Sequence, residues 1–246
     1  PQLGTGHALL QTEPVLKGKK GTVLLLYADV PLLESGTLAR LVEAHRTARA
    51  AATVLTAELD DPYGYGRIVR DTSGTISRIV EERDASAAHR AIHEINSGIY
   101  TMSLAPLFEH LHGLATDNAQ GEYYLTDLIA MYRQKDMRVE TLCLDSADEL
   151  RGVNSRLDLA ELSAVMRQRK NRSLMVGGTT LEDPATTYVD VDVTVGIDTI
   201  IGPGVRLEGT TTIGDRCRIH AGARLTNATV DNDVEVLDYS VIVNST

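Results

Sequence analysis

The 246-residue sequence contains 24 lysines and arginines against 34 aspartates and glutamates, which gives a net charge of −10, and 43% of its residues are apolar. This apolar content is ample for a buried core, and the length allows one large domain plus a smaller one. An acidic chain offers little basic surface for nucleic acid or an anionic membrane, and no run approaches the roughly 20 apolar residues that span a bilayer. The N-terminus has no signal-peptide pattern, and Cys143 and Cys217 have neither metal-binding nor CxxC spacing. We therefore expect a cytoplasmic protein with two free thiols.

The first two thirds of the chain alternate apolar runs with helical patterns. The run 22–27 predicts a strand buried on both faces of a parallel sheet, residues 38–45 show helical spacing, and 52–59 predicts a second strand. Together they form one β-α-β unit. The further predicted elements are a loop rich in glycine and tyrosine at 60–66, a hairpin of 67–70 and 76–81, a strand at 98–102, helices at 104–114 and 123–134, and a strand at 139–144.

A single helix follows, which we interpret as a linker between two domains. Its apolar positions fit helical spacing, Ser155 is suited to the N-cap, and Gly177 and Gly178 end it.

Beyond Tyr188 an aliphatic residue recurs every six positions, and a small or β-branched residue follows most of them four positions later. Such a double stripe cannot be a helix. Each six-residue unit predicts one side of a triangular coil, with the aliphatic side chain inside and Gly196, Gly202 and Gly214 serving the corners. About three coils fit before Thr246, where the pattern is still running. The aliphatic positions are Val189, Val195, Ile201, Leu207, Ile213, Ile219 and Leu225 and, after a one-residue deletion, Val230, Val236 and Ile242.

Several segments have residues suited to ligand binding. Asp29 follows the predicted strand at 22–27, and a carboxylate at the carboxyl end of such a strand can bind Mg²⁺ beside substrate phosphates. The two glycines in 2–7 could bring backbone amides close to a nucleotide, and the glycine turn of 61–67 has tyrosine walls suited to a sugar ring. Each segment could equally be structural, as a turn-forming aspartate or an ordinary glycine loop.

Four further polar residues stand next to apolar segments and could hydrogen-bond a ligand or cap a helix or turn. They are Glu81, Glu94, Asn96 and Asn154. The seven histidines lack metal-ligand spacing, and the sequence gives no support for covalent catalysis by a Ser/His/Asp or Cys/His arrangement.

The ordered combination of these segments is more specific than any one of them. The blocks are QLGTGHA, YADVPLL, DDPYGYGRI, IVEERDA, EINSGIY, NAQGEYYLTD and GVNSR. In this order they resemble the bifunctional bacterial enzyme family N-acetylglucosamine-1-phosphate uridyltransferase / glucosamine-1-phosphate N-acetyltransferase. The resemblance covers nearly the whole chain and continues into the six-residue repeats.

The resemblance implies an α/β fold and a division of the chain into three parts. Residues 1–154 would form a Rossmann-like nucleotidyltransferase domain, a mixed sheet with helices on both faces. Residues 155–178 would form the linker helix, and 179–246 the start of a left-handed parallel β-helix, the acetyltransferase domain. Because β-helices of this family associate side by side, the resemblance also implies a homotrimer.

The resemblance further implies site residues and a cofactor. Asp29 and Asn154 would hold Mg²⁺ and act in catalysis through it. Around them, the implied substrate-binding residues are Gly4, Thr5, Tyr27 and Ala28 for the nucleotide, Gly66, Glu81 and Asn96 for the N-acetylglucosamine moiety, and Tyr124 and Thr126 nearby.

The implied reaction transfers UMP from UTP to N-acetylglucosamine-1-phosphate and gives UDP-N-acetylglucosamine and pyrophosphate for cell-wall precursor synthesis. The sugar phosphate attacks the α-phosphorus in line, and no enzyme nucleophile is required. The parent protein would also acetylate glucosamine-1-phosphate with acetyl-CoA, at a site in later coils that lie outside this sequence.

The sequence departs from the family pattern at two places. The glycine-rich signature loop, with an arginine and a lysine that bind the triphosphate, is absent upstream of Pro1, so we expect the 246-residue chain alone to be weakly active or inactive. Ala28 replaces the usual glycine, and we expect a local adjustment there. Two alternatives are transfer to another sugar-1-phosphate and a non-catalytic regulatory subunit, although retention of Asp29 and Asn154 argues against the second.

Overall fold

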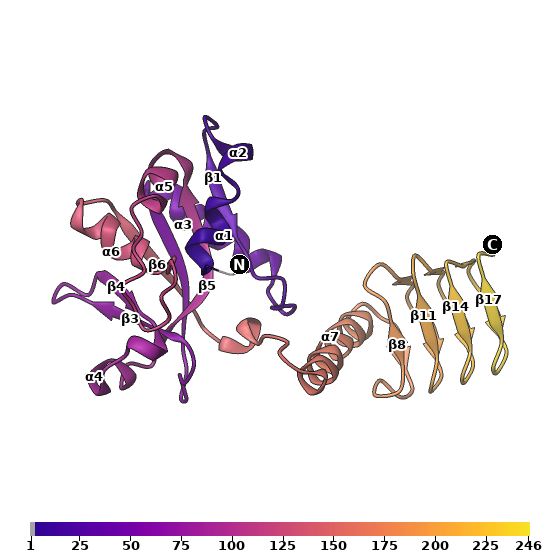
Figure 1. The fold of residues 1–246 in the computed structure, drawn as a ribbon. Coiled ribbons are helices and arrows are strands. Elements are labelled where there is room, and N and C mark those ends of the chain that lie inside the picture. The colour runs from indigo at the N-terminus through magenta and orange to yellow at the C-terminus, as the bar shows by residue number, and fades with distance from the viewer. Residues whose placement is uncertain (1–2) are drawn as a thin grey trace. The chain divides into compact units, whose positions relative to one another are not determined.

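The computed structural model describes residues 3–246, and Gln2 of the glycine-containing opening segment lies outside them. The chain forms two compact units, Pro1–Gly152 and Val153–Thr246 (Figure 1). Separate clusters of buried apolar side chains lie within them, as expected of two domains.

The first unit is built on one mixed sheet. Its strand order is β4-β3-β5-β2-β6, and β1 also pairs with β5. The β2–β6 pair is parallel, and all pairs with β5, like the β3–β4 hairpin, are antiparallel. The strands are β1 (Thr22–Leu25), β2 (Ala52–Glu58), β3 (Gly66–Arg70), β4 (Ile76–Val80), β5 (Glu94–Ser103) and β6 (Val139–Leu144).

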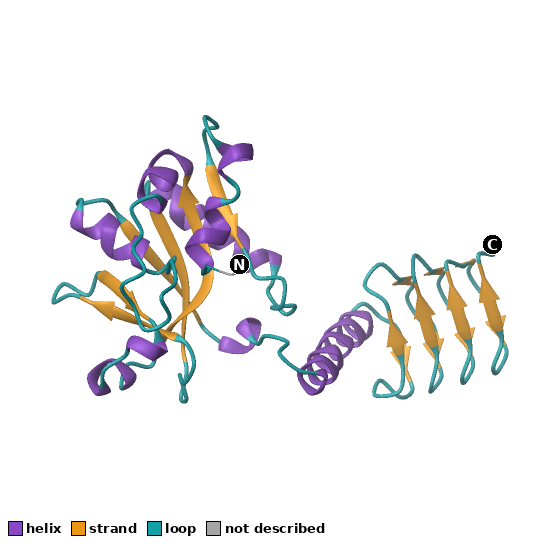
Figure 2. Cartoon of the chain, in the orientation of Figure 1, coloured by secondary structure: helices purple, strands orange, loops and turns teal. Residues whose placement is uncertain are grey.

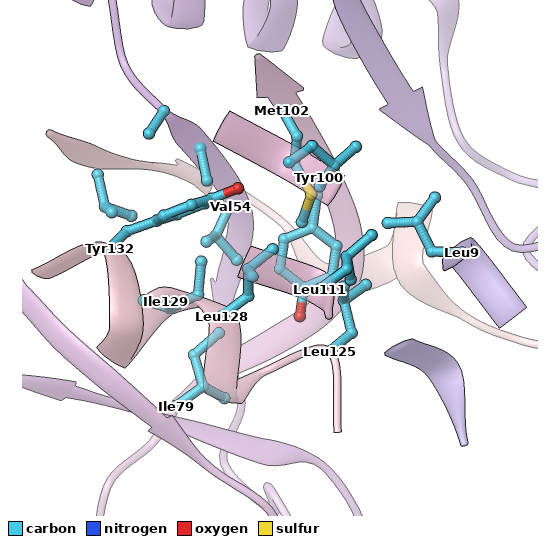
Figure 3. Packing of buried hydrophobic residues seen from close by; sticks show 14 of the residues in the cluster. Leu9, Val54, Ile79, Tyr100, Met102, Leu111, Leu125, Leu128, Ile129 and Tyr132 are labelled. Carbon is cyan, nitrogen blue, oxygen red and sulfur yellow. The ribbon is translucent and has the colours of Figure 1, made fainter. Parts of the chain in front are cut away.

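Helices cover both faces of this sheet, because neighbouring residues of a strand point to opposite sides. Val54 of β2 packs in a cluster that includes Tyr132, Leu128 and Ile129 of the last helix of the unit (Figure 3). Leu55 packs on the other face with residues that include Leu41. The predicted α/β fold with a mixed sheet is therefore confirmed. The helices are α1 (Thr5–Leu10), α2 (Glu13–Leu16), α3 (Ser35–Ala48), α4 (Ala87–Arg90), α5 (Leu104–Leu111) and α6 (Asp127–Gln134), with 3₁₀ turns at Glu82–Asp84 and Ala147–Leu150.

The prediction for 22–27 is wrong in three respects. β1 contains only Thr22–Leu25, pairs antiparallel with β5, and has exposed or half-buried residues. Because β2 is also antiparallel to β5, β1 and β2 run parallel to each other with β5 between them. An apolar run reports burial but carries no information about which strand lies beside it, so the sequence could not reveal the insertion of β5.

Two other boundaries differ from the predictions. β5 begins at Glu94, four residues before the predicted strand, and α6 begins at Asp127, four residues after the predicted helix start. The additional residues of β5 and the turn before α6 both contribute to the candidate site.

A buried histidine links α3 to the sheet. His45 Nδ1 lies 3.1 Å from Thr53 Oγ1, and its Nε2 lies 3.1 Å from Ser103 Oγ. Since the Ser103 hydroxyl donates to Ala50 O at 2.8 Å, Ser103 Oγ accepts from Nε2–H of His45. Burial, with a smaller contribution from Arg46, lowers the pKa of His45.

We therefore expect this histidine to make stability depend on pH. Above pH 6.5, the ordinary histidine pKa, folded and unfolded states are both neutral and its contribution to stability is complete. As pH falls below that value, the unfolded state takes up the proton first, so the free energy of unfolding decreases. Urea titrations at about pH 7.5 and about pH 5.5 should show a smaller decrease for His45→Gln than for wild type. An equal decrease in both proteins would contradict this expectation.

The second unit consists of one helix followed by a parallel β-helix (Figure 2). Within residues 3–246 its strands form three sheets of four, four and three strands. Each predicted aliphatic position falls in a strand. The strands are β7 (Thr180–Leu181), β8 (Tyr188–Val189), β9 (Thr194–Val195), β10 (Ile200–Ile201), β11 (Arg206–Glu208), β12 (Thr212–Ile213), β13 (Arg218–Ile219), β14 (Arg224–Thr226), β15 (Thr229–Val230), β16 (Glu235–Val236) and β17 (Val241–Val243).

The pairing of these strands confirms the six-residue period and its one-residue deletion. Ile201 pairs with Ile219, eighteen positions later, whereas Ile219 pairs with Val236, seventeen positions later. The first strand, β7, begins eight residues before Tyr188, so the coils start ahead of the recognisable six-residue pattern but within the range 179–246 expected for the β-helix. At the corner formed by Gly214, a Cβ would lie 2.7 Å from the backbone N of Asn232, so the coil stacked there leaves no room for a larger residue at this position.

The predicted linker helix, α7 (Arg156–Val176), begins at a capping box. Ser155 Oγ accepts from Asp158 N at 3.1 Å, and Asp158 Oδ2 accepts from Ser155 N at 2.8 Å. The N-cap prediction is thus confirmed.

α7 packs on the first coil of the β-helix. Lys170 Nζ donates to Val191 O at 2.8 Å and to Val193 O at 2.7 Å, and Asn171 Nδ2 donates to Pro184 O at 2.8 Å and to Thr187 O at 3.0 Å. These carbonyl groups belong to the first coil. α7 donates to them at the end of the β-helix, where the backbone of a further coil would otherwise pair. α7 is therefore an integral part of the second unit.

Candidate functional site

Three of the predicted sugar-binding residues converge at one end of the first unit's sheet. The antiparallel register places Gly66, the first residue of β3, opposite Asn96 of β5. Glu81 directly follows β4, the hairpin partner of β3. A Cβ on Gly66 would lie 3.5 Å from both Asn96 Cβ and Glu81 Oε2. The absence of a side chain at Gly66 therefore leaves a small gap bordered by Ile79, at 3.1 Å from that Cβ position, by Asn96 and by the Glu81 carboxylate.

Tyr27 lies against the same end of β5, over Gly98. Gly98 has φ 77°, and a Cβ there would lie 2.0 Å from Tyr27 Cε2. Asn96 Oδ1 accepts from Gly98 N at 3.0 Å, which holds the carboxamide beside this bend of the strand. The glycine in the block EINSGIY is visible in the sequence. Only the structure shows that the ring of Tyr27 excludes a larger residue at this position.

We expect Gly98→Ala to destabilise the first unit and displace Tyr27. The methyl group cannot fit beside the ring, so overpacking adds about 1–3 kcal/mol to the cost of a left-handed residue. Gly74→Ala is the matched control, because Gly74 also has positive φ, 82°, but nothing lies within 4 Å of the point that its methyl group would occupy. Urea unfolding of both variants measures the difference, and equal losses would show that the ring contact is unimportant.

The segment before α6 contacts both a residue predicted to bind the nucleotide and a residue predicted to bind the sugar. Thr126 Oγ1 donates to Glu81 Oε1 at 2.9 Å, and Leu125 N donates to Thr5 Oγ1 at 3.2 Å. Gly4, with φ 100°, is the N-cap of α1, so the predicted glycine loop is in fact the start of a helix. A Cβ at Gly4 would approach Tyr123 O to 2.7 Å. Gly4 and Thr5 are thereby held against the segment that also contacts Glu81.

Tyr124 is buried in the same segment, and its hydroxyl donates to Gln120 Oε1 at 3.0 Å. Burial and then Asp84 raise the pKa of Tyr124 to about 12, so the hydroxyl keeps its proton at neutral pH.

The site is electrostatically acidic. Burial, and then Asp127 and Asp84, raise the pKa of Glu81, while the hydrogen bond from Thr126 opposes the increase. Burial, and then the charges of Glu81 and Asp29, raise the pKa of Tyr27. Tyr27 thus lies within electrostatic range of both carboxylates, one predicted for the sugar and one for the metal.

A cavity of about 380 Å³ opens beside Glu81. Of its lining residues, Glu82, Arg83 and Gln120 were not predicted from the sequence, although they lie in the blocks IVEERDA and NAQGEYYLTD. Its complete lining is Tyr63, Gly64, Glu81, Glu82, Arg83 and Gln120.

The predicted metal ligands lie in different units. Ala28 and Asp29 are exposed in a turn after β1, whereas Asn154 lies in the second unit, where its backbone N donates to Asp158 Oδ2 at 3.0 Å. Their pairing around an ion stays a prediction. Within residues 3–246 no group of three or more His, Cys, Asp or Glu residues is arranged to hold a metal ion. Over the same residues, no helix is both long and apolar enough to cross a membrane.

Two family models match the chain. The family described as "Nucleotidyl transferase" matches residues 1–148, and "Bacterial transferase hexapeptide (six repeats)" matches residues 192–227. The first match covers more than half of the chain and almost all of the first unit. The second contains six consecutive strands of the β-helix, β9 to β14.

Curated relatives with the name "Bifunctional protein GlmU" align with almost the entire chain. The protein from Pelotomaculum thermopropionicum is 52% identical over 99% of this chain and 53% of its own length. Those from Levilactobacillus brevis and Pelobacter propionicus are 48% and 45% identical, over 96% and 99% of this chain and 51% and 53% of their own lengths. The chain thus spans about half the length of these relatives. The resemblance to a bifunctional bacterial family is confirmed, and the chain belongs to the nucleotidyl transferase family, with hexapeptide repeats of the left-handed β-helix type in its second unit.

Proposed function

We propose that the first unit transfers UMP from UTP to N-acetylglucosamine-1-phosphate, giving UDP-N-acetylglucosamine and pyrophosphate. The observation that carries this proposal is the convergence of Gly66, Glu81 and Asn96 around a gap beside Tyr27. A carboxylate accepts hydrogen bonds from sugar hydroxyls, and a carboxamide can both donate and accept, as an acetamido group requires. Membership of the nucleotidyl transferase family and the similarity to the relatives support the reaction class.

The chemistry needs no covalent intermediate with the protein. A phosphate oxygen of the sugar phosphate forms a bond to the α-phosphorus of UTP, and the bond from that phosphorus to the bridging oxygen breaks, so that pyrophosphate leaves with the electron pair. The contribution of the chain is to hold the two anions in line and fix the sugar. In this proposal, Gly4, Thr5, Tyr27 and Ala28 line the nucleotide.

We propose Mg²⁺ as the cofactor, with Asp29 and Asn154 as its protein ligands. Carboxylate and amide oxygens are hard donors that suit this ion. Asp29 fits the role because it is exposed in its turn, and among residues 3–246 no lysine or arginine forms a salt bridge with it. Bound there, the ion would offset the negative charge of the phosphates.

Pyrophosphate release tests the proposal. The protein as its gene encodes it is incubated with UTP, Mg²⁺ and either N-acetylglucosamine-1-phosphate or glucose-1-phosphate. We expect a clear preference for the acetylated amino sugar. Preference for glucose-1-phosphate would establish the other sugar specificity. No release with either, together with no Mg²⁺-dependent binding of UDP-N-acetylglucosamine, would establish a non-catalytic role.

For the encoded protein we also propose a second activity, acetyl transfer from acetyl-CoA to glucosamine-1-phosphate, and trimers formed through the β-helix. The name of the relatives supports bifunctionality, and the hexapeptide match supports the β-helix. Cytoplasmic localisation and a role in cell-wall precursor synthesis belong to the same proposal. Sedimentation equilibrium tests the trimer, and formation of free thiol from acetyl-CoA tests the acetyl transfer.

A further inference from the structure

The first unit buries an arginine directly beside the candidate sugar site. Arg67 is only 2% exposed and is among the largest fully buried side chains. Its Nη2 donates to Glu82 Oε2 at 2.8 Å, and its Nη1 contacts Tyr65 O. Within residues 3–246 its Nε has no hydrogen-bond partner. A buried guanidinium with such a specific carboxylate partner is costly to desolvate, so its position needs an explanation beyond general stability.

Glu82 gathers contacts from two separate segments. Besides Arg67 of β3, it accepts from Arg90 Nε of α4 at 3.0 Å. Burial alone would raise the pKa of Glu82, but the hydrogen bonds from Arg90 and Arg67 outweigh it and lower the pKa below its usual value. The carboxylate is therefore ionised at neutral pH and can bind both arginines.

These contacts surround the residues proposed to bind the sugar. Arg67 directly follows Gly66, and Glu82 directly follows Glu81. In the hairpin, Arg67 is opposite Val80, the residue before Glu81. The ion pair therefore joins the two chain segments that face each other across the gap at Gly66. Glu82 itself lines the 380 Å³ cavity, so the ion pair also holds one wall of that cavity.

We propose that the Arg67–Glu82 ion pair is a positioning device that sets the separation of Gly66 and Glu81 and thereby the affinity for the sugar phosphate. The proposal rests on the proposed function, because the gap at Gly66 is taken as the sugar site. Neither residue needs to contact the substrate. Arg90 binds the same carboxylate from the exposed side, at 54% side-chain exposure, and its Nη2 donates to the backbone O of Glu82 at 3.3 Å.

Arg67→Met and Arg90→Met are a matched pair for the test, because each removes one arginine from the same carboxylate. Arg67→Met should raise KM for N-acetylglucosamine-1-phosphate by about 10-fold or more, while KM for UTP changes less than about 2-fold. Arg90→Met should leave both KM values near wild type. A purely stabilising role for Arg67 would reduce the amount of folded enzyme and kcat without this selective change in KM.

Two further variants keep the test decisive if Arg67→Met does not fold. Glu82→Gln keeps the shape of the acceptor, and the Arg67→Met/Glu82→Gln double variant leaves no unpaired buried charge. If the residues act as one unit, the double variant should raise KM for the sugar phosphate no more than the stronger single variant. Additive effects, or wild-type KM values in the folded variants, would overturn the proposal.

Hydrogen exchange separates this proposal from the proposed function. The amide of Tyr65, which donates to Pro62 O at 3.2 Å next to the carbonyl that Arg67 Nη1 contacts, should exchange faster in Arg67→Met or Glu82→Gln than in wild type or Arg90→Met, whichever sugar phosphate the enzyme uses. If the two variants exchange faster but wild type releases no pyrophosphate, the proposed function is wrong and the ion pair still acts as a positioning device. Unchanged exchange in an active enzyme would disprove the positioning device alone.

Discussion

Replacement of Asp29 by asparagine is expected to lower kcat/KM for UMP transfer by at least about 100-fold, equivalent to roughly 2.7 kcal/mol of transition-state stabilisation. The substitution preserves size but removes the negative charge that we propose binds Mg²⁺. Because Asp29 is exposed in a turn, the fold should be unaffected. Raising the Mg²⁺ concentration should partly restore activity, which a structural defect would not allow.

Asp145→Asn is the control for this prediction. Asp145 is also exposed and follows a strand, β6, in the same sheet. It should retain wild-type activity and Mg²⁺ dependence. Full activity of Asp29→Asn at low Mg²⁺ would remove Asp29 from the metal site.

Replacement of Glu81 by glutamine is expected to raise KM for N-acetylglucosamine-1-phosphate by about 10- to 100-fold with little change in KM for UTP, because a hydrogen bond to a charged group contributes about 1.5–3 kcal/mol. The carboxylate is held beside Gly66 and Asn96, where it can accept from sugar hydroxyls. Glutamine at this position still accepts from Thr126 but has no charge.

The pH dependence of the reaction is an independent test of the role of Glu81. The pKa of Glu81 is raised chiefly by burial, so the carboxylate is protonated at a higher pH than an ordinary glutamate as pH falls. We expect kcat/KM of wild type to decline through that raised pKa and Glu81→Gln to lack this acidic limb.

Thr126→Val should move the acidic limb to higher pH, because the hydrogen bond that opposes the rise in the pKa of Glu81 is lost. If the acidic limb of the pH profile persists unchanged in Glu81→Gln, it belongs to the titration of another group. Asp127 is the next candidate, since its pKa is also raised, by burial and then by Asp84.

The candidate site depends on a mixed sheet in which β5 contacts three other strands. β5 pairs with β2 along almost its whole length, with β1 near its C-terminal end and with β3 at its N-terminal end. The turn after β1 and the start of β3 consequently meet near Asn96 and Gly98. This arrangement brings residues 27, 66, 81 and 96 together although they are spread over nearly 70 positions.

The two units differ in how much of their structure is predictable. In the β-helix, every coil repeats the same local requirement for an aliphatic residue inside and a compact corner, so a six-residue period specifies both the strands and their register. The one-residue deletion between Leu225 and Val230 is recognisable in the sequence for the same reason. In the first unit, the sequence determined most of the strands and the longer helices but not the short helices α1, α2 and α4. It also determined which polar residues follow the strands and the family that combines them.

Only the tertiary structure decided which of those segments are neighbours. Strand pairing in the mixed sheet depends on contacts between distant residues, so the insertion of β5 between β1 and β2 leaves no periodic signal. The same holds for the burial of Arg67 against Glu82 and for the packing of α7 on the first coil. A charged residue in a sequence is most often solvated, and only its surroundings in the fold show that this arginine and this carboxylate are held together.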